Sequence, residues 1–170
     1  MKKRVFIAIS ILLGISLYIL ATVPLPLPFE EKRLIVLSHA IPFLDPNPHA
    51  QIIRYANIAN RLFRVSLQYA AVDSQKSIFF AYRAEHCMTL MVAQLRKVTE
   101  TDTIPYSFLR STFSSQSEML EYLREKSLQK KNVEEIISFA QRNEKTAMVL
   151  YFNGLPPEKS VSQDWGNATR

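Results

Sequence analysis

Glu85, His86 and Cys87 are adjacent and carry the side chains that a cysteine–histidine nucleophile would use. That chemistry requires the imidazole to lie within hydrogen-bond reach of the thiol. The surrounding pattern predicts a helix, in which neighbouring residues point about 100° apart. We therefore interpret Cys87 as a small buried core residue. Because it is the only cysteine, the chain has no internal disulfide and no cysteine-based zinc site.

Two further patterns contain residues capable of chemistry. His39, Asp45 and His49 are metal-ligand types, but their spacing matches no known metal-binding loop. Ser127 and Lys130 form an S-x-x-K pattern that lacks its companion S-D-N and K-T-G motifs. The three glycines are not arranged as a phosphate-binding loop. We predict no catalytic residue, no metal site and no cofactor, and we expect a protein that is not an enzyme.

The remaining candidate site is a row of arginines. Arg54, Arg61 and Arg64 fall at helical spacing on one polar stripe of a strongly apolar segment. Such a stripe is commonly a solvated helix face, and the alternative is docking to an acidic partner or to lipid headgroups. The net charge of +6 is compatible with either. We expect no nucleic-acid binding, because no platform of aromatic and basic residues accompanies the arginines.

The elements that position these residues begin with an uncharged segment, Val5–Val23, which follows Lys2, Lys3 and Arg4. As a helix it would be about 28 Å long, close to the bilayer core of about 30 Å. The preceding charges favour a cytoplasmic N-terminus. We interpret the segment as an uncleaved single-pass signal anchor that contacts membrane lipid, with the domain outside the cytoplasm, or in the periplasm of a Gram-negative source. A cleaved signal peptide is the alternative.

After the anchor, the alternating Pro24–Pro28 predicts a stiff stalk. We expect a short amphipathic helix over Phe29–Ala40, and the three prolines of Ile41–His49 predict an irregular hinge. The predicted organisation is therefore an anchor over 1–23, a Pro-rich stalk and hinge over 24–48, a helical domain over 49–154 and a disordered tail over 155–170.

The helical domain is predicted from apolar periodicity and from the scarcity of glycine. Helices are expected over His49–Val72 and Gln75–Val98, joined at Asp73-Ser74 as a long α-hairpin, with one continuous helix as the alternative. Gln94 is assigned to the polar side of the second helix. The fold class is all-α: an N-terminal transmembrane helix, a Pro-rich stalk and a small helical domain.

The rest of the predicted domain is divided by capping signals. Pro105 opens a short helix, the capping box Ser115-x-x-Glu118 starts another through Leu128, and Asn132 caps the last. The apolar run 147–152 is read as helix, with a buried strand as the alternative. The functional hypothesis is a membrane-anchored, non-enzymatic interaction or accessory subunit that binds a protein partner or itself. The alternatives are a membrane-tethered hydrolase or lipid-modifying enzyme, and an exported helical binding protein.

Overall fold

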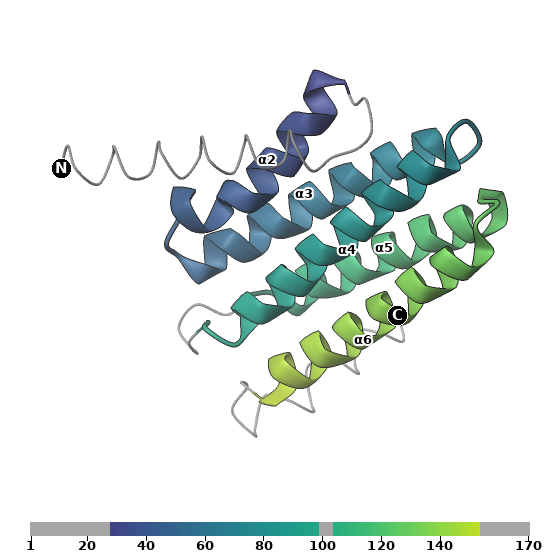
Figure 1. Ribbon diagram of the computed structural model, residues 1–170. Coiled ribbons are helices and arrows are strands. Elements are labelled where there is room, and N and C mark those ends of the chain that lie inside the picture. The colour runs from purple at the N-terminus through teal and green to yellow at the C-terminus, as the bar shows by residue number, and fades with distance from the viewer. Residues whose placement is uncertain (1–27, 99–103, 154–170) are drawn as a thin grey trace.

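The computed structural model describes residues 28–98 and 104–153, and over these residues the chain forms five α-helices and no strand (Figure 1). The all-α prediction is confirmed for this part of the chain. The predicted anchor, nearly all of the Pro-Leu stalk and the tail lie outside the described residues. None of the described helices combines the length and the apolar character needed to cross a membrane. The helices are α2 (Phe29–Leu44), α3 (Pro48–Tyr69), α4 (Ser74–Leu95), α5 (Tyr106–Lys126) and α6 (Lys130–Asn153).

Helices α3 and α4 form the predicted antiparallel hairpin and make the most extensive contact of any helix pair in the described structure. Asp73 ends the turn, because its carboxylate accepts a hydrogen bond from the Lys76 backbone N–H at 3.0 Å and caps α4. The Ser66 hydroxyl donates to the Ser77 carbonyl oxygen at 2.8 Å and joins the two helices inside the core.

Helices α3, α4, α6 and α5 pack in that cyclic order as a four-helix bundle, and α2 packs on α3 outside it (Figure 1). Helix α4 contacts both α3 and α6, so its buried surface is wide. Gln94 is buried on this surface, and its assignment to the polar side was wrong. The largest fully buried side chains of the described chain are Tyr55, Phe63, Phe80, Phe113, Ile35, Ile41, Ile52, Leu62, Met88, Met91, Leu109 and Leu123.

The predicted hinge over Ile41–His49 is wrong in extent. Helix α2 continues past Ala40 to Leu44 and includes Pro42, and only residues 45–47 separate it from α3. Ile35 and Ile41 are buried against the rest of the core, so packing holds α2 helical despite the proline. Pro48 occupies the first turn of α3, where a missing N–H costs no hydrogen bond.

In the second half, the predicted helix start at Pro105 is confirmed, whereas the predicted starts at Ser115 and Asn132 are wrong. The chain does not restart at Ser115, since α5 runs unbroken from Tyr106 to Lys126 and buries Leu109, Phe113 and Leu120 along one face. Asn132 lies inside α6, two residues after its start. The run 147–152 is helical, as predicted, and α6 continues to Asn153.

Candidate functional site

A cavity of about 320 Å³ lies between α3 and α5, and α4 contributes Met88 to its wall. This volume is near the lower limit for pockets that hold small ligands or inserted side chains. No charged residue lines it. Its lining consists of six apolar and six uncharged polar residues: Ala56, Ala59, Phe63, Met88, Phe108 and Met119, and Asn57, Asn60, Ser111, Thr112, Ser115 and Gln116.

The polar lining of the cavity is rich in hydrogen-bond acceptors. The hydroxyls of Ser111 and Thr112 donate to the Phe108 carbonyl oxygen at 3.0 and 2.8 Å, which leaves their oxygens able to accept. Asn60 Oδ1 is buried and has no hydrogen-bond partner within the described structure. A buried acceptor without a partner is destabilising.

The three candidate arginines lie on the exposed side of α3, beside this cavity. Arg61 and Arg64 share a helix face with the lining residues Asn57 and Asn60, at spacings of three and four residues. Neither arginine is part of an ion pair within the described residues. Arg54 differs, since its guanidinium lies 3.4 Å from an Asp45 carboxylate oxygen.

A buried carboxyl group lies next to the cavity. The Glu85 residue of α4 is only 3% exposed. Gln116 Nε2 of α5 donates to one of its carboxylate oxygens and Asn143 Nδ2 of α6 donates to the other. Asn143 Nδ2 also donates to Thr89 Oγ1 at 2.9 Å. Because Gln116 also lines the cavity, one amide connects the cavity to Glu85.

Burial raises the pKa of Glu85 to about 7, since the charged form loses its hydration inside the bundle. The hydrogen bonds from Asn143 and Gln116 act in the opposite direction and stabilise the carboxylate. Glu85 is therefore a group whose charge changes near neutral pH.

The structure also brings together two histidines that are far apart in sequence. The rings of His39 on α2 and His86 on α4 have centroids 6.5 Å apart, and Arg83 Nη1 lies 3.5 Å from His39 Nε2. The pKa of each histidine is lowered, chiefly by burial and further by the Arg83 charge. No carboxylate is hydrogen-bonded to either ring within the described chain, so this group lacks a partner that would make a histidine a general base.

The other sequence candidates lie apart from each other. Asp45 is engaged with Arg54, and no three His, Cys, Asp or Glu side chains of residues 28–98 and 104–153 gather in a group able to hold a metal ion. Cys87 is buried, and burial raises the pKa of its thiol to about 12. A thiol with so high a pKa is a poor nucleophile at neutral pH.

Sequence reasoning missed the Glu85 network and the Asn60 acceptor. A signal existed for Glu85: it follows Ala81 by four residues and precedes Met88 by three, so it falls on the apolar face of its helix. A carboxylate at such a position requires partners. Gln116 and Asn143 are far along the sequence, and nothing local marks them as those partners.

Comparison with known proteins adds no family or fold relationship: no protein-family model matches the chain, and no curated protein or solved structure is significantly similar to it.

Proposed function

We propose that this chain is a membrane-anchored, non-enzymatic interaction or accessory subunit, whose helical domain docks an acidic protein segment on the α3–α5 face. The observation that carries the proposal is the placement of Arg61 and Arg64. Both are exposed cations without carboxylate partners in the described structure, and they share a face of α3 with Asn57 and Asn60, which line a cavity with uncharged walls.

The chemistry of this face favours a peptide segment as the partner. Phe63, Met88 and Met119 form an adaptable apolar wall, which suits an inserted apolar side chain. The hydroxyl oxygens of Ser111 and Thr112 in the cavity lining suit backbone or side-chain N–H groups. Carboxylates next to the inserted side chain would pair with Arg61 and Arg64.

Membrane attachment is supported by the uncharged segment Val5–Val23 and the lysines and arginine before it. Tethering would raise the local concentration of the docking face at one membrane surface. In the self-association form of the proposal, the partner is a second copy of the chain, which contacts this face through its own α3–α5 face.

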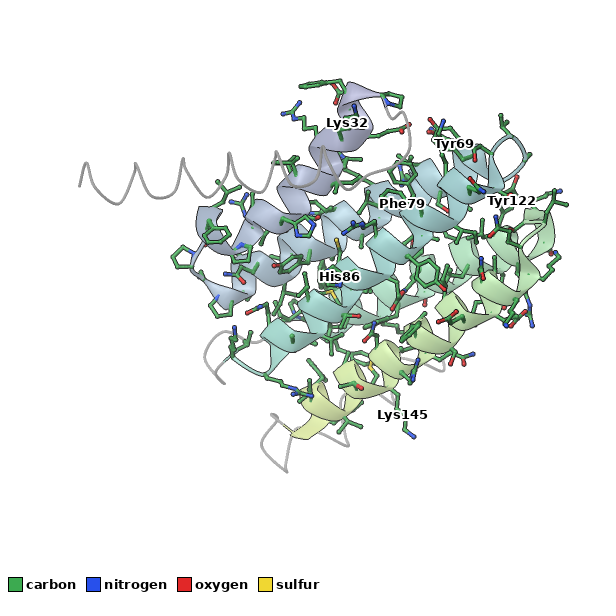
Figure 2. All side chains as sticks on the ribbon, in the orientation of Figure 1. Lys32, Tyr69, Phe79, His86, Tyr122 and Lys145 are labelled. Atoms are coloured by element: carbon green, nitrogen blue, oxygen red, sulfur yellow. The ribbon has the colours of Figure 1, made fainter. Side chains whose placement is uncertain are left out.

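The docking face can be tested in cells by photo-crosslinking. A photoreactive phenylalanine analogue replaces Asn57 at the cavity, and a matched variant carries it at Lys145, an exposed position on α6 (Figure 2). We expect a discrete crosslinked product from position 57 and none from position 145, in membranes that retain the protein after alkaline carbonate washing. Equal products from both positions would contradict the docking face, and release of the protein by the wash would contradict the anchor.

A further inference from the structure

The end of the bundle that carries residue 28 displays the three most exposed large apolar side chains of the described residues. Phe29 opens α2, Val72 lies in the α3–α4 turn and Leu128 lies in the α5–α6 turn. Their exposed fractions are 76%, 84% and 88%. Single exposed apolar residues are ordinary on protein surfaces. Here, however, one helix start and two turns, which come from separate parts of the sequence, bring these three residues to one end of the bundle.

Side-chain contacts show that these segments are neighbours. The Tyr69 hydroxyl at the end of α3 donates to Glu31 Oε1 in the first turn of α2, at 2.8 Å. Gln129 Nε2 in the α5–α6 turn donates to Ser74 Oγ at the start of α4, at 3.3 Å. The two turns and the start of α2 lie toward the same end of the ribbon in Figure 1.

The same end has unpaired positive charge. Lys32, Lys126 and Lys131 take part in none of the ion pairs of the described chain, whereas the nearby Glu30 and Asp73 are paired with Arg33 and Lys76. Carboxylates lie at this end as well: Glu31 accepts from Tyr69, Glu125 is exposed, and Arg124 is paired with both Glu121 and Glu134. The lysines are thus cations without ion-pair partners on an end of mixed charge. Lys130 Nζ donates to the carbonyl oxygens of Arg124 and Glu125, which holds its charge at the end of α5.

The short connection between Phe29 and the apolar segment limits how far this end of the bundle can lie from the bilayer. Only Pro24–Pro28 separate Val23 from Phe29. Even fully extended, five residues reach at most about 18 Å, which is much less than the length of α3, about 33 Å for 22 residues. An anchor at Val5–Val23 therefore keeps this end within about 18 Å of the apolar segment.

We propose that the end formed by Phe29, Val72 and Leu128 is a second membrane contact, in which these side chains enter the headgroup region of the bilayer and the unpaired lysines face lipid phosphates. Apolar side chains flanked by lysines are suited to such an interface. This inference rests on the anchor of the proposed function. It adds an orientation, in which the bundle helices, and with them the α3–α5 docking face, run parallel to the membrane normal.

The test is tryptophan quenching in the full chain, with Trp165→Phe removing the native tryptophan. Val72→Trp and Leu128→Trp report on this end. Leu44→Trp is the matched control, because Leu44 is also exposed, at 53%, and lies at the opposite end of α2. The protein is reconstituted into vesicles of brominated phosphatidylcholine and phosphatidylglycerol, and flotation is measured on the same samples.

We expect emission at positions 72 and 128 to shift to the blue and be quenched, and emission at position 44 to be unaffected. Chains that float while positions 72 and 128 behave like position 44 would overturn this inference and leave the anchor standing. Chains that do not float would overturn both. Crosslinking between copies through a cysteine at position 128, without quenching, would replace the lipid surface by a second copy and overturn the inference.

Discussion

The side-chain amide of Gln116 donates a hydrogen bond to the carboxylate of Glu85, and Gln116 also lines the α3–α5 cavity. The buried carboxyl of α4 and the candidate docking face are thus one side chain apart. Any occupant that changes the position of the Gln116 amide would change the hydrogen bonding, and therefore the pKa, of Glu85.

The first prediction concerns stability as a function of pH. The unfolded Glu85 carboxyl ionises near its ordinary pKa of 4.5, whereas the folded one keeps its proton to about 7. The folded state therefore loses stability as pH rises through this window, by about 3 kcal/mol at about 1.4 kcal/mol for each unit of pKa. His39 and His86, whose lowered pKa values act in the opposite direction, are common to this chain and to its Glu85→Gln variant. Thermal unfolding of the detergent-solubilised chain should therefore show Tm falling between pH 5 and pH 8 relative to the Tm of Glu85→Gln. An equal slope in both proteins would contradict the assignment.

The second prediction concerns the amide that connects the two sites. Gln116→Leu removes a donor to a buried carboxylate, which should cost about 1–3 kcal/mol of unfolding free energy at pH 8 and less at pH 5, where Glu85 is protonated. Gln141→Leu is the control, because Gln141 is exposed on α6. Unfolding followed by circular dichroism measures both. A loss of stability that is the same at both pH values would indicate a packing effect without a role for the charge.

How much of this was predictable from sequence differs between fold and site. The α3–α4 hairpin was predicted correctly because Asp73 is both a poor helix-interior residue and a good cap, and the pattern on either side has helical period. Ser115 misled because its capping pattern is local, whereas the burial of Leu109, Phe113 and Leu120 along α5 depends on the neighbouring helices. Pro42 misled for the same reason, since packing of α2 on α3 overrides its local preference.

The site was less predictable than the fold. The stripe of Arg54, Arg61 and Arg64 was visible as periodicity, but only the structure separates the Asp45-paired Arg54 from the other two. The contacts of Glu85 with Gln116 and Asn143 join residues 31 and 58 positions apart. Such pairings are set by helix packing, on which local patterns carry no information.

The third prediction concerns Cys87. Because its thiol is buried and its pKa is raised to about 12, maleimide should label the native protein far more slowly than it labels a Val72→Cys variant. In denaturant both cysteines should react at similar rates. Rapid labelling of native Cys87 would show that the core around it opens readily, contrary to its burial inside the helical bundle.

The fourth prediction separates stability from docking at Asn60. Its Oδ1 atom is buried without a partner in the described structure, so Asn60→Leu should leave Tm unchanged or raise it. The same change removes a polar amide from the cavity lining, so it should reduce the crosslinked product from position 57. Reduced Tm would mean that Asn60 already satisfies a structural role, and unchanged crosslinking would place the partner elsewhere.

Docking of an acidic segment on α3 is tested most directly by the yield of the position-57 crosslink in arginine variants of the full-length protein in membranes. If α3 docks an acidic segment, the double variant Arg61→Gln/Arg64→Gln should lose most of the crosslinked product. Arg54→Gln, whose guanidinium is already paired with Asp45, should keep most of it. Equal yields in the double variant and the unchanged protein, at equal membrane abundance, would contradict docking on this face.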